Sequence, residues 1–152
     1  IDAFYASNLT RSVQTAEILA APFGREVTQV PELAELDMGR WGGREMNLLW
    51  EEDQDGLRAW WADLENHPTP GGESLAQLRE RVIPALEALL ARHEGQTVCL
   101  VAHGGVNRVI LFDLLGLPLQ QFHVLAQDYS CRNRIHYFPD GKRLVTLVNG
   151  CE

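Results

Sequence analysis

"QTVCLVAHGGVNRVILFDLLG", residues 96–116, is the stretch of sequence that decides the fold. Its first part, "QTVCLVA", is a continuous apolar run of the kind that is buried on both faces of a parallel sheet. The second part, "VNRVILFDLLG", predicts a helix that Gly116 and Pro118 bring to an end. A strand that leads into a helix in this way is typical of open α/β folds, which bind ligands at the carboxyl ends of their strands.

The first thirty residues show the same alternation. Residues 2–7, "DAFYAS", predict a buried strand, and "LTRSVQTAEILAA" predicts a helix with Ser7 or Asn8 as its N-cap. "REVTQV", residues 25–30, predicts another strand. Strands that alternate with helices favour a parallel sheet with helices on both faces.

The rest of the chain completes the expected domain. Ser74 opens a helix with a buried apolar stripe, which Pro84 should kink or restart. Asp140 and the glycine after it predict the turn of a terminal hairpin. We therefore expect one α/β domain over residues 1–152. Its sheet is mostly parallel, with helices on both faces, and residues 44–70 form a small helical insertion, called here the cap segment.

Composition and charge limit what the chain can bind. The 152 residues are 45% hydrophobic, which suits one domain with a proper core. The formal net charge of -8 argues against nucleic acids and anionic membranes as partners, because both need a basic face. A few converging arginines could still bind a small anion. Three cysteines without zinc-binding spacing fit a reducing cytoplasm and predict no metal site.

His103 stands where the predicted strand meets the predicted helix. Gly104 and Gly105 let backbone amides approach a ligand closely, and the N-terminus of a helix presents N–H groups that suit an anion. His103 is therefore a candidate for ligand binding. The alternative is a strand-end histidine that bonds a backbone carbonyl.

Charged residues elsewhere are candidates for the same site. Arg11 lies in the first turn of a predicted helix, where a positive charge interacts unfavourably with the helix dipole. A bound anion nearby would offset this cost. Glu35 lies in a loop whose glycines could place a carboxylic acid for catalysis. Glu73, beside the predicted cap Ser74, is a further acid that could face a pocket. For each of these charged residues, a solvated side chain is the alternative.

Taken in chain order, these motifs resemble one family. The family is the histidine phosphatase superfamily, which has the phosphoglycerate-mutase-like fold. Its successive signatures resemble four stretches of this chain, namely "YASNLTRSVQTAEILA" (5–20), "LAELDMGRWGG" (33–43), "GGES" (71–74) and "VAHGGVNRV" (101–109). The resemblance covers essentially all of the chain.

The resemblance implies a role for each candidate. Arg11 matches the arginine that grips the phosphoryl group, and Glu35 matches the acid that protonates the leaving oxygen. His103 matches the second histidine, which holds the phosphoryl oxygens, and the Gly104 amide would add a donor. The implied enzyme hydrolyses the phosphomonoester of a small metabolite through a phosphohistidine, without metal or cofactor.

One family signature is absent from these 152 residues. It is Arg-His-Gly, which follows the family's first and central strand and carries the nucleophilic histidine. The interpretation we favour is that a strand, loop and helix precede Ile1 in the natural protein, so that the 152-residue chain alone is inactive. The alternative is a domain that binds phosphate ligands or other proteins without catalysis.

The resemblance also indicates a branch of the family. The compact cap segment, "GGES" and "HGGV" are similar to the α-ribazole-5'-phosphate phosphatases of cobalamin assembly. A broad-specificity sugar-phosphate phosphatase fits nearly as well. The oligomeric state stays open, a homodimer included.

Overall fold

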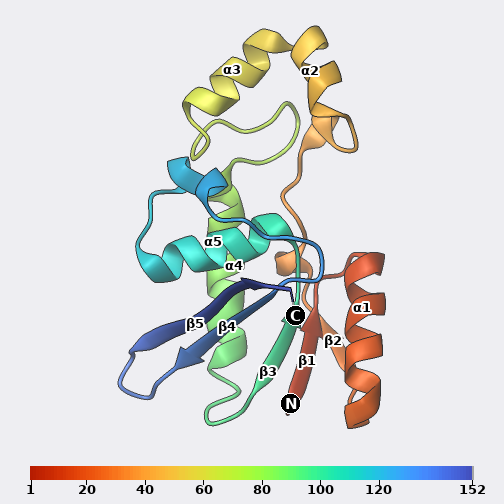
Figure 1. The fold of residues 1–152 in the computed structure, drawn as a ribbon, viewed down its shortest axis with the longest axis vertical. Helices are drawn as coiled ribbons and strands as arrows, with labels where there is room; N and C mark the ends of the chain where they lie inside the picture. The colour runs from red at the N-terminus through yellow and green to blue at the C-terminus, as the bar shows by residue number, and fades with distance from the viewer. Residues whose placement is uncertain (152) are drawn as a thin grey trace.

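A parallel sheet of three strands forms the centre of the fold (Figure 1). The computed structural model describes residues 1–151. Phe4 of the middle strand pairs with Val27 on one side and with Cys99 on the other. The order β2-β1-β3 is formed by β1 (Ala3–Ala6), β2 (Val27–Gln29) and β3 (Val98–Val101). The expected parallel sheet is confirmed.

Helices cover both faces of this sheet, as predicted. Side chains alternate along a strand, so neighbouring residues of β1 face opposite sides. The ring of Phe4 lies 5.4 Å from that of Phe23, which follows α1 (Thr10–Ala20) through the short helix η1 (Ala21–Phe23). On the other face, the hydroxyl of Tyr5 lies 2.6 Å from Nε2 of His93, just beyond α4 (Leu75–Leu90).

The main hydrophobic core lies where α4 packs against α5 (Gly104–Leu115). Val109 and Phe112 of α5 are completely buried. Leu100 of β3 packs against the same cluster, so the helix that follows β3 folds back onto the sheet. Gly116 ends α5 in the left-handed conformation, with φ 65°, as the sequence predicted.

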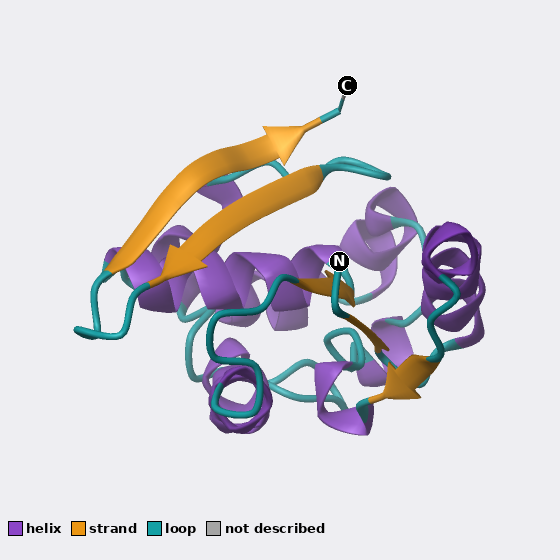
Figure 2. Cartoon of the chain, turned by 90° about the horizontal axis from the view of Figure 1, so that it is seen from below, coloured by secondary structure: helices purple, strands orange, loops and turns teal. Residues whose placement is uncertain are grey.

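A separate two-stranded antiparallel sheet follows α5 and η4 (Leu119–Val124). Its strands are β4 (Arg132–Tyr137) and β5 (Arg143–Gly150), which confirms the predicted hairpin. Gly141 has a φ of 82° in the connecting turn. Figure 2 shows this hairpin apart from the three shorter strands.

Two local predictions were wrong. The N-cap of α1 is Leu9, with no capping side chain, because the hydroxyl of the expected cap Ser7 lies against His103 instead. Asn8, the other expected cap, is exposed. Of the two outcomes expected at Pro84, the restart is wrong, because α4 runs through this residue, and the kink stays a prediction. Pro84 is exposed, so water can reach the carbonyl that loses its helical partner.

The cap segment contains α2 (Met46–Glu52) and α3 (Gln54–Ala62), which extend away from the sheet (Figure 1). Trp41, Leu49 and Leu57 form a small hydrophobic cluster of their own, and Trp60 packs against both this cluster and the main core. Trp41 also donates from Nε1 to Asp53, 3.1 Å away. No helix within residues 1–151 has the length and apolar character needed to cross a membrane.

The chain enters and leaves the cap segment through two stretches that lie against each other. The amide of Arg40 donates to the carbonyl of Pro70 at 2.9 Å, next to η3 (Gly39–Trp41). Gly39 has a φ of 51°, and a Cβ there would lie only 2.5 Å from the same carbonyl oxygen. Only glycine therefore fits at position 39, where the two stretches lie against each other. This position is a few residues after Glu35, which follows η2 (Pro31–Leu33).

Candidate active site

His103 is the residue on which the other candidates converge. It caps α5 directly after β3, and 7% of its surface is exposed. The hydroxyl of Ser7, at the end of β1, lies 2.6 Å from its Nε2. Nη2 of Arg11, in the first turn of α1, lies 3.2 Å from its Nδ1. The carboxyl ends of two neighbouring strands thus bring His103 and Arg11 together.

These contacts define the hydrogen position on the His103 ring. A guanidinium can only donate hydrogen bonds, so Nδ1 accepts from Arg11 and carries no hydrogen. Neutral imidazole then carries its hydrogen on Nε2, which donates it to the Ser7 hydroxyl oxygen. His103 therefore presents a lone pair, and not a donor, on the side where Arg11 lies.

The electrostatics of the site favour the neutral form of His103. Burial lowers the pKa of its imidazole most strongly. The nearby Glu35 carboxylate opposes this effect by raising the pKa. The positive charges of Arg11 and Arg81 lower it further, and the pKa ends below its ordinary value.

Glu35 reaches the first turn of α5 from its loop. Both of its carboxylate oxygens lie 3.1 Å from the amide nitrogen of Gly105, which donates to them. Its Oε1 also accepts from the amide of Leu36, 2.8 Å away. A carboxylate beside the N-terminus of a helix is stabilised by the helix dipole. Glu35 thus binds α5 at Gly105, two residues after His103. The structure therefore brings Glu35 close to His103 and Arg11, as expected.

Glycine at position 105 makes this approach possible. A Cβ on Gly105 would overlap with Oε1 of Glu35. A Cβ on Gly104 would lie 3.3 Å from the end of the Arg108 side chain and 4.0 Å from Gln127, without overlap. The Gly105 amide therefore donates to the Glu35 carboxylate. The Gly104 amide is the one that the resemblance assigned as a donor to the ligand.

Two outcomes differ from the sequence reasoning. Ser7 belongs to the site, although the sequence indicated only a helix cap; its place at the end of a strand next to "NLTR" was the only signal. Glu73 pairs with Arg81, with 2.5 Å between Oε1 and Nη2, a partner that the sequence reasoning did not predict. No cluster of His, Cys, Asp or Glu within residues 1–151 could hold a metal ion.

The other histidines lie in different surroundings. His93 accepts or donates at Tyr5 and Gln96, and His123 packs its ring against Trp61. Of the histidines in the described part of the chain, only His103 is bonded to Arg11.

Comparison with known proteins relates this chain to a family. A family model for the histidine phosphatase superfamily (branch 1) matches residues 1–150. Phosphoserine phosphatase 1 of Hydrogenobacter thermophilus is 32% identical over 136 residues, which are 90% of this chain and 64% of that protein. A Salmonella paratyphi B protein named "probable phosphoglycerate mutase GpmB" is 36% identical over 132 residues, 87% of this chain and 61% of that protein.

Solved structures share the fold. The α-ribazole phosphatase from Shigella flexneri matches with a TM-score of 0.86 at 25% identity, over 98% of this chain and 73% of that one. The chain therefore spans 61–64% of the length of the two curated relatives and more of this solved structure.

Proposed function

We propose a phosphomonoesterase function from one premise: this chain belongs to the histidine phosphatase superfamily (branch 1). The observation that carries the proposal is the convergence of Arg11, His103 and Glu35 at the start of α5. Phosphoryl transfer needs positioned cationic and hydrogen-bonding groups around a spreading negative charge, and this group provides them.

In the proposed reaction, a histidine nucleophile attacks the phosphorus and the bond to the leaving oxygen breaks. Glu35, in its protonated form, gives its proton to that oxygen, and the carboxylate then takes a proton from the water that attacks the phosphohistidine. Phosphate leaves and the nucleophile is regenerated. Arg11 neutralises the phosphoryl oxygens, and a fork of N–H donors suits such an anion.

The ring geometry of His103 adds a condition to this scheme. Because the Nε2 hydrogen goes to Ser7 and Nδ1 carries a lone pair, His103 can donate to a phosphoryl oxygen from Nδ1 only after Nδ1 is protonated. The negative charge of a bound phosphoryl group favours that protonation. Arg11 would then leave Nδ1 and bind the phosphoryl group itself.

The nucleophile is the part that these residues do not supply. No Arg-His-Gly occurs in the 152 residues. We propose that a longer natural protein contributes this histidine and that the 152-residue chain alone binds phosphate without turnover.

The test compares two proteins on the same substrates. The 152-residue chain and the protein from the natural reading frame are assayed against p-nitrophenyl phosphate and a panel of alkyl phosphate esters. We expect turnover only from the longer protein, and a Glu35→Gln variant slowed far more on the alkyl esters than on p-nitrophenyl phosphate. Equal slowing on both substrates would remove Glu35 from the acid role. An inactive longer protein that carries the upstream histidine would refute the enzyme proposal.

For the substrate, we propose a small phosphorylated metabolite, with α-ribazole 5'-phosphate first on the panel and sugar phosphates beside it. The compact cap segment and the likeness to the Shigella flexneri phosphatase support this order.

A binding domain without catalysis is the second candidate, favoured by the lack of a second histidine beside Arg11 within the described residues. It predicts that inorganic phosphate binds with equal affinity to both proteins, that Arg11→Gln abolishes the binding, and that neither protein turns over any ester.

A further inference from the structure

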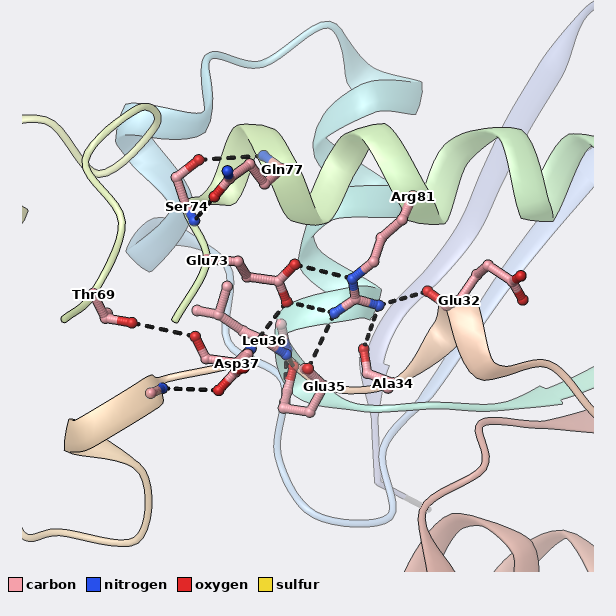
Figure 3. A network of polar contacts seen from close by, with 12 residues as sticks. Glu32, Ala34, Glu35, Leu36, Asp37, Thr69, Glu73, Ser74, Gln77 and Arg81 are labelled. Carbon is pink, nitrogen blue, oxygen red and sulfur yellow. Dashed lines mark hydrogen bonds and ion pairs between the residues drawn. The ribbon is translucent and has the colours of Figure 1, made fainter. Parts of the chain in front are cut away.

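The loop that carries Glu35 is held by a side chain from another element. Arg81 lies on α4 and extends its guanidinium to the loop backbone (Figure 3). Its Nη1 donates to the carbonyls of Glu32 at 2.6 Å and Ala34 at 2.9 Å, and its Nη2 donates to the carbonyl of Glu35 at 3.1 Å. One planar fork of donors therefore binds the backbone on the N-terminal side of Glu35 and at Glu35 itself.

Glu73 fixes the fork and the other end of the loop. Its two carboxylate oxygens accept from Nε of Arg81 at 3.0 Å and from Nη2 at 2.5 Å (Figure 3). Oε1 of Glu73 also accepts from the amide of Asp37 at 2.9 Å, and the amide of Glu73 donates to the carbonyl of Asp37 at 2.9 Å. The ion pair therefore holds the chain on both sides of Glu35.

The surroundings make this ion pair more than a surface contact. The side chains of Arg81 and Glu73 are 26% and 16% exposed, so solvent screens them only in part. The loop between η2 and η3 has no regular ladder of its own around Glu35. The carbonyls of Glu32, Ala34 and Glu35 accept from the Arg81 side chain instead, and the bidentate pair with a carboxylate gives that side chain a defined geometry.

We propose that Arg81, held by Glu73, is the positioning residue for Glu35 and fixes its carboxylate at the Gly105 amide. The proposal rests on the proposed function for its catalytic meaning, because Glu35 is the acid there. Arg81 does not touch the reacting atoms in this scheme. It acts through the backbone of Glu35, and its loss lets the carboxylate leave Gly105.

The direct test measures the Gly105 amide and needs no enzyme activity. Hydrogen exchange of the 152-residue chain is followed by NMR for Gly105 and Leu36, with Val109 inside α5 as the reference. We expect Arg81→Gln to lower the protection of Gly105 and Leu36 about tenfold, the loss of roughly one hydrogen bond, and to leave Val109 unchanged. In Arg81→Lys, the protection of Gly105 and Leu36 should lie between that of the wild type and that of Arg81→Gln, because lysine keeps the positive charge but not the planar fork of donors.

The matched control is Arg79→Gln, two residues earlier on the same helix. Arg79 pairs with Asp113, with 2.6 Å between Nη2 and Oδ1, and makes no hydrogen bond to the Glu35 loop. Arg79→Gln should leave the exchange protection of the Gly105 amide as in the wild type. If Arg81→Gln keeps Gly105 protected, or lowers all α5 amides equally, the pair only stabilises the domain and the proposal fails.

A second arm links position to catalysis in the longer protein. Arg81→Gln should slow alkyl phosphates more than p-nitrophenyl phosphate, as Glu35→Gln does, and the double variant should be no slower than Glu35→Gln alone. Additive slowing would overturn the proposal. If the longer protein shows no turnover, the proposed function fails, and the exchange experiment still decides the role of Arg81.

Discussion

The amide of Gly105 donates to the carboxylate of Glu35, with the nitrogen 3.1 Å from each oxygen, across 70 residues of sequence. This contact joins a loop to the first turn of α5, directly beside His103. A free amide at a helix N-terminus needs an acceptor, and Glu35 provides it. The candidate acid and the candidate phosphate-binding histidine are thereby parts of one local unit.

Replacing Gly105 with alanine should break this unit. The new Cβ would overlap with Oε1 of Glu35, so the carboxylate must move away. The Glu35 end is flexible and can move at little cost, so the expected loss is that of the hydrogen bonds from the Gly105 amide to the carboxylate, about 1–3 kcal/mol of unfolding free energy by urea denaturation. Gly104→Ala is the control, because its Cβ would meet Arg108 at 3.3 Å and Gln127 at 4.0 Å without touching Glu35, and it should stay within about 0.5 kcal/mol of the wild type. Equal losses in both variants would contradict the prediction.

Removing the Ser7 hydroxyl should leave the His103 ring without its acceptor. Ser7 is completely buried and lies 2.6 Å from Nε2. Ser7→Ala should therefore cost about 1–3 kcal/mol of unfolding free energy, the usual loss for an orphaned buried donor. Asn8→Ala, at the exposed neighbouring position, should cost far less. The ¹⁵N shifts of the imidazole should show hydrogen on Nε2 in the wild type and also in Ser7→Ala, because Arg11 still donates to Nδ1 in both. Hydrogen on Nδ1 in the wild type would disprove the assigned tautomer.

The parts of the fold with a local signal were predictable. The apolar run before His103 gave β3, Ser74 caps α4 in a reciprocal pair with Gln77, and the glycine at 141 turns the hairpin. Each depends on the chemistry of a few consecutive residues. The parallel sheet followed from their order along the chain.

The contacts of the site were less predictable. A hydroxyl at a strand end suits both a helix cap and a distant ring, and only the packing of β1 beside β3 selects His103 for Ser7. Arg81 was not singled out, because its acceptors in the Glu35 loop are backbone carbonyls, which leave no mark in the sequence. The catalytic roles of Arg11, Glu35, His103 and the Gly104 amide remain predictions from the family resemblance.

The lowered pKa of His103 gives stability a pH dependence of known sign. In the unfolded chain, the imidazole takes up its proton near its ordinary pKa of about 6.5. In the folded protein it does so only at lower pH, because burial lowers the pKa. The unfolded state then binds more protons in this window, so stability falls as the pH falls from about 6.5 through the folded pKa. The measurement is urea denaturation at pH values from about 7.5 to about 5, which cover roughly this window. The free energy of unfolding should fall more steeply with falling pH for the wild type than for His103→Gln. Parallel curves would contradict this.

The cap segment should respond separately from the sheet to changes in its own small core. Leu49 is 1% exposed and packs with Trp41 and Leu57, apart from the main core, whereas its neighbour Leu48 is 44% exposed. Leu49→Ala leaves a cavity in this cluster and should destabilise the cap segment by about 2–5 kcal/mol. Because the two clusters share no buried residue and meet through Trp60, amide exchange should accelerate in α2 and α3 while β1 and β3 keep their protection. Leu48→Ala, on the same helix, should change neither. Equal acceleration in the sheet and in the cap segment would show that the two unfold together.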